Sequence, residues 1–440
     1  YDAPFTSRET GNAFTIDPIT EEKQLRTYEL VASKQNVSLR EGEQTEMFTY
    51  NGQFPGPILR AKEGERVRVH FKNRLSEPST IHWHGMQVEN DMDGVPGLTQ
   101  DPVPPGGNFT YEFQVNQSGT YWYHPHYETD HQIEKGLYGP LIIDEANQGL
   151  PIDKDAVLMI DDIRLDDRNR IPEGTGGHDV MHGRMGNVML INGLSSYAVE
   201  INQSSVLRLR LINPSNARTY AFTMEGMPFS VIGHDIGELR QPYTADQVVL
   251  APGQRKDILV IPDKTGTFPL SVDVGFDTIR LGHINVTKGN SSQSLTLTSL
   301  EQLVLNEDLP DWNHLQGQPP NVTVELAPRM GRGNFQWTLN GKSSNIQAEQ
   351  LSFQEGKQYV MRFENLHGLP HPMHLHGQKF QVIARDGKPV HSRGFLDTVL
   401  VRGGETVDIA FIAEGEGVWA NHCHILEHAE AGMLLEMHVS

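Results

Sequence analysis

The 440-residue chain has a single cysteine, Cys423, and no long apolar run. One cysteine excludes a disulfide within the chain, so hydrophobic cores must stabilise the fold. A membrane-spanning helix needs about 18 consecutive apolar residues, and the longest runs here are short ones such as AVLMI at 156–160. We therefore expect no membrane span.

Basic residues are also in short supply. The chain has 36 Lys and Arg against 56 Asp and Glu, a formal net charge of −20. A surface this acidic repels nucleic acid backbones and anionic membranes and tolerates neutral or cationic partners. The chain begins at Tyr1 rather than Met, which predicts that a leader was removed and that the protein is secreted or periplasmic.

Long helical patterns are scarce, whereas alternation of apolar and polar residues is frequent. Val67, Val69 and Phe71 alternate with polar residues, and leucines alternate with arginines over 207–211. Both patterns predict half-buried β-strands. Because 42 Gly and 26 Pro punctuate such segments, the sequence indicates all-β sandwiches or barrels.

The strand segments recur along the chain. RVRVHFKN, VLRLRLIN and QYVMRFEN end 140 and 152 residues apart, at Asn73, Asn213 and Asn365. A glycine that is soon followed by an aromatic residue recurs 147 and 151 residues apart, at Gly119, Gly266 and Gly417. Both series indicate three homologous β-domains. We expect them at 1–147, 148–293 and 294–440, with polar, turn-rich joins near 145–153 and 288–300.

Pairs of histidines separated by one residue occupy the same offsets in the first and third repeats. The second repeat has Phe222 and Met224 where the others have their first pair. Residues two apart on a strand project from the same face, so each pair presents two imidazoles, which suit Zn, Cu, Fe or Ni. The first and third repeats therefore carry a metal site that the second has lost. Its eight histidines are His82, His84, His124, His126, His374, His376, His422 and His424.

The segment HCHILEHAEAGM near the C-terminus narrows the choice of metal. Cys423 lies between His422 and His424, so in an extended strand its sulfur points away from their rings. His428 and Met433 follow five and ten residues after the cysteine, and His371 is the natural second imidazole. A thiolate, two imidazoles and a weak thioether are the ligands of a blue-copper electron-transfer centre.

At these residues the chain resembles the three-domain multicopper oxidases of the bacterial laccase type. The family's copper motifs stand here as HWHG (82–85), HPH (124–126), HPMHLHG (371–377) and HCHILEHAEAGM (422–433). The resemblance implies three consecutive cupredoxin-like Greek-key β-sandwich or barrel domains, the second a spacer without copper ligands. It also implies four copper ions: type 1 bound by His371, Cys423, His428 and Met433, type 2 by His82 and His374, and a type 3 pair by His84, His124, His126, His376, His422 and His424.

The activity that this resemblance implies is one-electron oxidation of phenols or aromatic amines coupled to four-electron reduction of dioxygen to water. Electrons would enter through His428, which we expect at the surface, and pass from Cys423 to its neighbouring histidines. Because the three-copper cluster takes ligands from the first and third domains, we expect it at their interface. We expect the protein to be a monomer.

Reduction of dioxygen to water consumes protons, so a carboxylate near the cluster is expected. Asp93, in NDMDGVPG, matches the acidic residue of bacterial relatives; the alternative is a turn-forming Asp before Gly94. Several relatives also carry an acid directly after the second type 1 histidine. This chain has Ala429 there, which leaves Glu427 and Glu430 as candidate substitutes.

The electron donor is the least determined feature. The segment GGHDVMHGRMGNVML contains soft ligands suited to Cu(I), namely His178, Met181, His182, Met185 and Met189. The alternative is a loop with methionine as filler. A cuprous oxidase of copper tolerance thus stands beside the laccase-type oxidase. A copper-binding or electron-transfer protein without turnover would show gaps among the cluster ligands, and the sequence has none.

Overall fold

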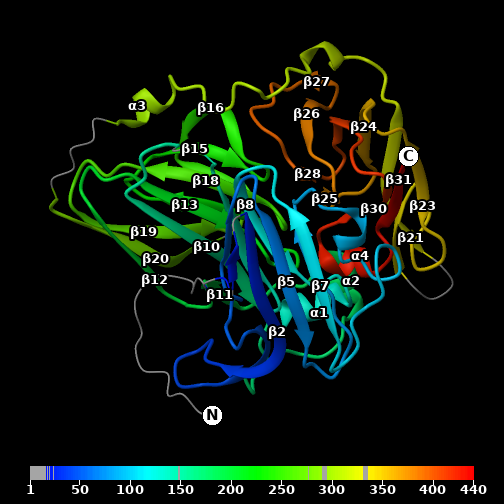
Figure 1. Cartoon of the computed structure of the whole chain (residues 1–440), viewed down its shortest axis with the longest axis horizontal. Helices are drawn as coiled ribbons and strands as arrows, with labels where there is room; N and C mark the ends of the chain where they lie inside the picture. Colours follow the sequence, from blue (N-terminus) through cyan, green and yellow to red (C-terminus); the bar gives the residue numbers. More distant parts are fainter. Residues whose placement is uncertain are drawn as a thin grey trace.

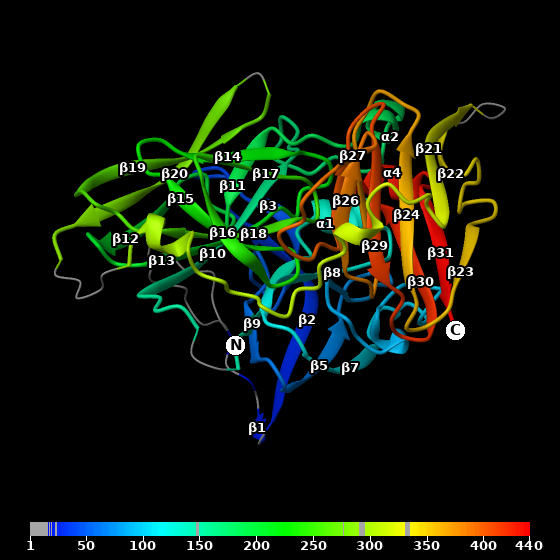
Figure 2. The same cartoon turned by 90° about the horizontal axis from the view of Figure 1, so that it is seen from above.

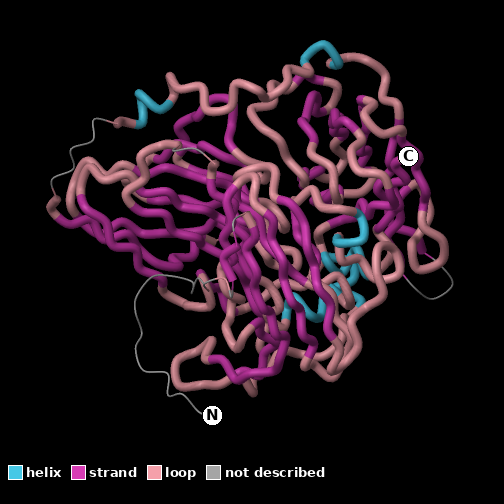
Figure 3. Tube along the Cα trace, viewed as in Figure 1, coloured by secondary structure: helices cyan, strands magenta, loops and turns pink. Residues whose placement is uncertain are grey.

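The computed structural model describes residues 16, 18, 20–22, 24–146, 149–275, 277–289, 295–330 and 335–440. Regular structure is almost entirely β (Figure 3), as the alternation predicts. The helices of the described residues are short: α1 (Thr129–Glu134), α2 (Gly177–His182), α3 (Leu297–Leu300), α4 (Leu426–Glu430) and the 3-10 turns η1 (Asn90–Met92) and η2 (Asn313–Leu315). Within these residues, no helix is long and apolar enough to cross a bilayer.

The first sandwich comprises β1 (Thr20–Glu22), β2 (Leu25–Val37), β3 (Thr45–Tyr50), β4 (Leu59–Lys62), β5 (Arg66–Asn73), β6 (His82–His84), β7 (Asn108–Gln114), β8 (Gly119–His124) and β9 (Gly139–Asp144). One sheet has the order β1-β2-β5-β7, with β3 alongside β2, and the other β4-β9-β8-β6. The two sheets share one core, in which Val69 and Trp83 are fully buried.

The second sandwich comprises β10 (Lys154–Ile163), β11 (Val188–Ile191), β12 (Tyr197–Asn202), β13 (Leu207–Ile212), β14 (Tyr220–Met224), β15 (Phe229–His234), β16 (Glu238–Ala245), β17 (Gln247–Leu250), β18 (Arg255–Val260), β19 (Gly266–Asp273) and β20 (Thr278–Thr287). Its sheets have the orders β11-β10-β13-β18-β15-β16 and β12-β20-β19-β14-β17. Leu209 and Phe222 belong to the core between them.

The third sandwich comprises β21 (Val322–Met330), β22 (Phe335–Leu339), β23 (Glu349–Phe353), β24 (Gln358–Asn365), β25 (His371–Leu375), β26 (Phe380–Arg385), β27 (Lys388–Pro389), β28 (Thr398–Val401), β29 (Thr406–Ile412), β30 (Gly417–Cys423) and β31 (Leu434–Val439). Its sheets have the orders β22-β21-β24-β29-β26-β27 and β23-β31-β30-β25-β28. This topology repeats that of the second sandwich, strand for strand.

The three asparagines that end the recurring segments make the same hydrogen bonds. Each Nδ2 donates to a carbonyl four or five residues ahead: Glu77 for Asn73, Arg218 for Asn213, Leu369 for Asn365. Each Oδ1 accepts from the amide two residues ahead. The asparagine therefore fixes the turn that follows its strand, which gives the repeat a structural cause.

The half-buried prediction is right for β5 and wrong for β13. In β5 Val67, Val69 and Phe71 are buried between more exposed polar residues, whereas every residue of β13 is buried. The first sandwich covers the polar face of β13: Arg208 pairs with Glu145, which follows β9, at 2.9 Å, and Arg210 donates to Thr120 on β8 at 3.0 Å. Arg208 also pairs with Asp257 on the neighbouring strand β18 at 2.6 Å. The arginines of β13 therefore contact protein groups, whereas the alternating sequence predicted that they would contact solvent.

The three sandwiches contact one another pairwise, and the second and third also meet directly, for example where Ile236 forms a β-bridge with Phe395. In Figures 1 and 2 the green strands of the second sandwich are on the left, the orange and red strands of the third on the right, and the blue and cyan strands of the first lie lower in the view. The predicted joins include residues 147, 148 and 290–294, which lie outside the described residues. The helices α1, α2 and α4 gather near the contact of the first and third sandwiches (Figure 3).

Candidate metal centres

A small centre of one sulfur and two imidazoles lies inside the third sandwich. His371 begins β25, Cys423 ends β30, and His428 lies on α4. Cys423 Sγ is 3.6 Å from His371 Nδ1 and 3.7 Å from His428 Nδ1, and the two Nδ1 atoms are 3.2 Å apart. All three side chains are fully buried. The prediction of a His2Cys arrangement at these residues matches this geometry.

The protonation chemistry of the small centre fits a bound cation. Burial lowers the pKa of His371 to about 3 and that of His428 well below its usual value, so both imidazoles are neutral and able to ligate. Burial raises the pKa of the Cys423 thiol, and a thiolate in apolar surroundings needs a positive charge beside it. Met433 is buried in the same core and its carbonyl accepts from the Cys423 amide at 3.1 Å. This donor set suits copper.

The prediction that His428 lies at the surface is wrong. The residue is 0% exposed, because α2 covers it: His428 Nε2 lies 3.2 Å from the carbonyl oxygen of Met181. Trp337 fixes the helix from the other side, since its Nε1 donates to the Val180 carbonyl at 2.8 Å and its ring lies 4.4 Å from that of His428. A donor therefore meets α2 before it meets His428.

The methionine- and histidine-containing segment divides into two parts. Met181 and Met185 are 37% and 40% exposed, and the rings of His178 and His182 lie 4.7 Å apart on α2. Met189 instead lies on β11 and packs against the core of the second sandwich. Two methionines and two histidines thus lie outside the small centre, and the third methionine has a packing role.

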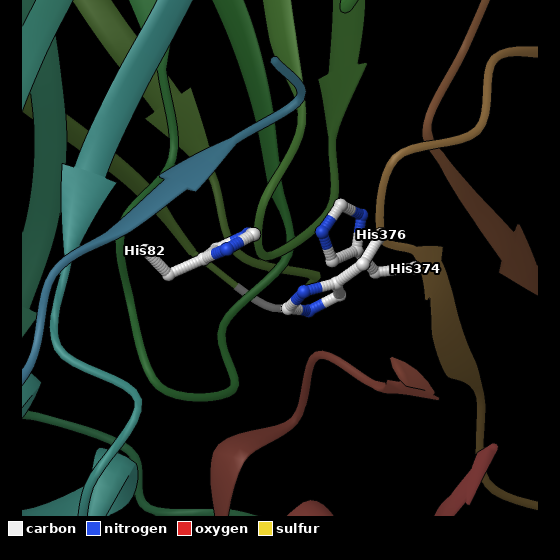
Figure 4. Close-up of side chains that lie close together, drawn as sticks. All are labelled: His82, His374 and His376. Atoms are coloured by element: carbon white, nitrogen blue, oxygen red, sulfur yellow. The ribbon is translucent and has the colours of Figure 1, made fainter. Parts of the chain in front are cut away.

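The eight paired histidines come together between the first and third sandwiches. In the first, β6 and β8 pair so that His82 opposes His124; in the third, β25 and β30 pair so that His374 opposes His422. Rings stack across the junction: His82 on His376 at 3.9 Å, and His84 on His374 at 3.8 Å. Figure 4 shows His82 approaching from one strand, with His374 and His376 facing it from another. The predicted convergence of these residues is what the structure contains.

Hydrogen bonds orient one nitrogen of most rings toward protein and the other toward the centre of the cluster. Nδ1 of His82, His374 and His124 each contacts a backbone carbonyl at 2.8–3.0 Å. The Nε2 atoms of these three residues are buried and have no hydrogen-bond partner within the described chain. Such nitrogens are available as metal ligands.

The rings of His376 and His422 place two nitrogen lone pairs close together, an arrangement that a bound cation would stabilise. His376 Nδ1 contacts Asp93 Oδ2 at 2.9 Å, and His422 Nδ1 contacts the Cys423 carbonyl at 2.8 Å. Each Nδ1 therefore carries the proton, so each Nε2 presents a lone pair. The two Nε2 atoms are only 3.0 Å apart. Lone pairs at this distance repel one another unless a metal ion lies between the rings.

His84 has the reverse orientation. Its Nε2 donates to Asp397 Oδ1 at 3.1 Å, and its buried Nδ1 has no partner among the described residues. Asp397 is itself held by Arg255, whose Nη1 and Nη2 donate to the two carboxylate oxygens at 2.8 and 2.6 Å. All three side chains are fully buried. Arg255 thus positions His84 through Asp397, so that Nδ1 faces the cluster.

The second sandwich therefore reaches the cluster although it contributes none of the eight histidines. Arg255 begins β18, directly after the turn 251–254. Gly253, in that turn, has φ +86°, and a Cβ there would lie 2.9 Å from His424 and 3.1 Å from His84. Gly85 has φ +87°, and a Cβ there would lie 2.2 Å from Arg255 Nη2. The glycine of HWHG leaves room for this ion pair.

Replacing Arg255 with methionine should lower the free energy of unfolding by about 3–5 kcal/mol, because Asp397 would remain buried without its cation. Copper binding by the histidine cluster should weaken as well, while the small centre stays intact. Chemical denaturation and metal analysis measure both effects. The double variant Arg255→Met/Asp397→Asn is the control: it should recover most of the stability, since no unpaired charge remains. A double variant as unstable as the single one would contradict this account.

Asp93 lies at the cluster, as predicted. It is 1% exposed. Its two carboxylate oxygens lie 2.9 Å from His376 Nδ1 and 3.2 Å from His82 Nδ1. The residue directly follows η1 as its C-cap and precedes Gly94, so it also has the turn position that the alternative interpretation gives it. One side chain thus contacts a histidine from each of two sandwiches.

The two candidate substitute acids have other partners. Glu427 is 1% exposed, and its Oε1 accepts from Asn216 Nδ2 at 2.7 Å, while Arg184 Nε lies 3.9 Å away. Burial raises the pKa of Glu427 to about 7. Glu430 accepts from the Thr129 amide at 2.8 Å. Within the described residues, neither acid makes a hydrogen bond or ion pair to one of the eight histidines.

Together, these features define a class: an oxidoreductase of cupredoxin fold, in which one His-Cys-His tripeptide joins a His2Cys centre to an eight-histidine cluster. Family models described as multicopper oxidase match residues 31–148, 161–293 and 317–440. The chain belongs to the multicopper oxidase family, whose members use copper and dioxygen.

Individual relatives are similar over nearly the whole chain. Multicopper oxidase mco of Staphylococcus aureus is 28% identical over 439 residues, 97% of this chain and 91% of that protein. Laccase-1 of Cryptococcus neoformans var. grubii is 28% identical over 96% of this chain and 82% of its own length. The structure of the Campylobacter jejuni multicopper oxidase, described as a metallo-oxidase, has a TM-score of 0.85 and 28% identity, covering 98% of this chain and 96% of that one.

Proposed function

We propose that this multicopper oxidase is laccase-like: it oxidises phenols and aromatic amines by single electrons and reduces dioxygen to water. One observation carries the proposal. The tripeptide His422-Cys423-His424 belongs to both centres, so electrons that arrive at the sulfur reach two cluster histidines along a few covalent bonds. Copper would supply the redox chemistry at both centres.

We propose four copper ions with the ligands that the family pattern assigns. The type 1 ion takes His371, Cys423, His428 and Met433, and the type 2 ion takes His82 and His374. The type 3 pair takes the other six histidines, with His84 ligating through Nδ1. The orphaned nitrogens described above support this assignment. We also propose the domain boundaries 1–147, 148–293 and 294–440.

The side chains divide the work of the reaction. Cys423 transmits electrons, seven buried histidines and the half-buried His126 hold the cluster, and Asp93 holds or releases a proton beside His82 and His376. The donor does not contact His428 directly, because α2 lies between them. Its electrons can therefore be transferred without a binding site shaped to the donor. Electron transfer through a covering helix favours small, easily oxidised donors.

The proposal is tested on fully copper-loaded protein. Metal analysis should find four copper ions per chain, and the spectrum should show the intense absorption of a thiolate-copper bond. Oxygen uptake should then be measured with a phenol, a non-phenolic dye and Cu(I). Turnover of the phenol and the dye without release of peroxide is expected, and copper-loaded protein that consumes no oxygen with any donor would refute the proposal.

Met433→Leu should keep the blue colour and raise the reduction potential of the type 1 copper. A thioether stabilises the oxidised ion, and leucine, which is similar in volume, removes only that donation. A redox titration followed by absorbance measures the shift. Met437→Leu, in the same buried core on β31, is the matched control and should leave the potential unchanged. A lowered potential in Met433→Leu would mean that this methionine is not a ligand.

A cuprous oxidase is the second candidate, and one observation favours it. The helix over His428 is α2, which carries the exposed Met181 and the neighbouring rings of His178 and His182. Thioethers and imidazoles bind Cu(I), and an ion held there would be close to the entry point for electrons.

The double replacement Met181→Leu/Met185→Leu separates the two candidates. If donors are organic, phenol and cuprous oxidation should each change by less than about threefold, roughly 0.7 kcal/mol of transition-state stabilisation. Met189→Leu is the control, since Met189 packs in the core of the second sandwich. A tenfold or larger loss confined to Cu(I), and absent in the control, would favour the cuprous oxidase.

A further inference from the structure

A cavity of about 280 Å³ lies between the second and third sandwiches and has an unusual lining. Six basic side chains border it, and no Asp or Glu does, in a chain whose formal net charge is −20. The second sandwich supplies His234 and Lys256, and the third supplies Arg385, His391, Arg393 and Arg402.

The basic groups of the cavity have few counter-charges. Arg385 and Arg402 share one carboxylate, that of Glu405, at 2.9 and 3.7 Å. Lys256 and Arg393 form no ion pair with any described residue; the Arg393 guanidinium instead lies over the ring of Tyr243, 4.9 Å from its centroid. Three guanidinium groups and the Lys256 ammonium therefore have a single ion-paired carboxylate, that of Glu405, among them.

The acid whose charge acts most strongly on Lys256 is Asp235, and its oxygens already have other partners. Asp235 accepts from the backbone amides of Arg255 at 2.8 Å and Thr398 at 3.3 Å, and its Oδ1 lies 3.9 Å from the Arg255 guanidinium. Lys256 is 8% exposed. Burial and Arg255 lower its pKa, Asp235 and Asp397 raise it in part, and the resulting pKa is about 8. A buried ammonium without an ion-pair partner is costly unless an anion joins it.

The walls of the cavity between these cations are aliphatic. Val249, Val382, Val390, Leu396 and Val399 all line it. An inorganic anion would leave this apolar surface without a partner, whereas a short hydrocarbon skeleton would cover it. Guanidinium groups match carboxylates in geometry and can bind them through two hydrogen bonds.

We propose that this cavity binds a small organic polycarboxylate, a molecule with two or three carboxylates on a short aliphatic skeleton. The carboxylates pair with Lys256 and Arg393, and the skeleton contacts the aliphatic walls. Because the cavity takes residues from two sandwiches, the bound anion joins them. Gln254, which lines the cavity, already donates to the Thr398 carbonyl across the same joint at 2.9 Å.

The test uses the copper-loaded protein and propane-1,2,3-tricarboxylate, which lacks the hydroxyl through which citrate chelates metals. Titration calorimetry should show one saturable site, and the midpoint of thermal unfolding should rise with ligand concentration. Lys256→Met and Arg393→Met should each weaken binding by about tenfold or more, since each removes a charged hydrogen-bond donor. Phosphate should bind more weakly than the tricarboxylate.

Matched controls separate this site from the copper centres and from general charge. Lys264→Met and Arg329→Met each remove one cation outside the cavity lining and should bind like the parent protein. The blue and cluster absorption should not change on binding. The proposal is overturned by absence of saturable binding, by equal weakening in the controls, by phosphate binding as tightly as the tricarboxylate, or by a ligand-induced change in the copper spectrum.

Discussion

Cys423→Ser should abolish the blue absorption and the oxidase turnover while the eight-histidine cluster keeps its copper. In the proposed type 1 centre the sulfur is the ligand responsible for the colour, and it begins a short covalent connection through His422 and His424. A serine hydroxyl neither gives the charge-transfer band nor carries electrons with comparable efficiency. With donors that reduce the type 1 centre, activity should fall below detection.

Metal analysis, absorption and oxygen uptake measure the three consequences separately. The variant should lose about one copper ion per chain and keep the remainder, because no cluster nitrogen changes. Met437→Leu again controls for disturbance of the core around Cys423. Sustained turnover of phenols by Cys423→Ser would show that electrons reach the histidines by another route, and the assignment of the small centre would fail.

The paired histidines could be predicted because strand geometry is local. Residues two apart share a face whatever the strand later packs against, so His82 with His84 and His374 with His376 were bound to point together. The repeat in turn showed which pairs correspond, and the recurring asparagines owe their position to the same side-chain hydrogen bonds in each sandwich. Both signals depend on a few neighbouring residues.

The misjudged features all depend on contacts between distant segments. α2 covers His428 from 247 residues away in the sequence, and no pattern within either segment reveals the other. β13 has the alternation of a half-exposed strand, but the first sandwich covers its arginines. Solvent exposure of a polar residue is decided by which surface packs against it, and sequence alternation cannot show that.

The Arg255–Asp397–His84 connection was missed for the same reason. The three residues come from three sandwiches and are separated by more than a hundred residues each. One feature of the sequence indicates that Arg255 has a charged partner: it follows a Pro-Gly turn at 252–253 and begins a strand of buried residues. A charge in such a strand needs a partner, although the sequence alone does not say which one.

Asp93→Asn should slow turnover by about a hundredfold or more while the donor still reduces the type 1 copper at a normal rate. General acid–base groups contribute roughly a hundredfold to ten thousandfold, and the change removes an ionisable carboxyl group without replacing a proposed copper ligand. Stopped-flow absorbance resolves the two steps, because bleaching of the blue colour reports reduction and its return reports reoxidation by dioxygen.

The geometry adds a second consequence of Asp93→Asn. The carboxylate meets ring nitrogens of both His376 and His82, at 2.9 and 3.2 Å, whereas an asparagine offers one acceptor and turns an N–H toward the other ring. Copper content must therefore be measured with the kinetics. Asp91→Asn is the matched control, since Asp91 is exposed on the same turn η1, and it should behave like the parent protein. A full copper content with slow reoxidation assigns proton transfer to Asp93. Slowed bleaching with normal reoxidation would contradict this role, because bleaching reports reduction of the type 1 copper. Loss of cluster copper would make Asp93 a positioning residue for the two histidines.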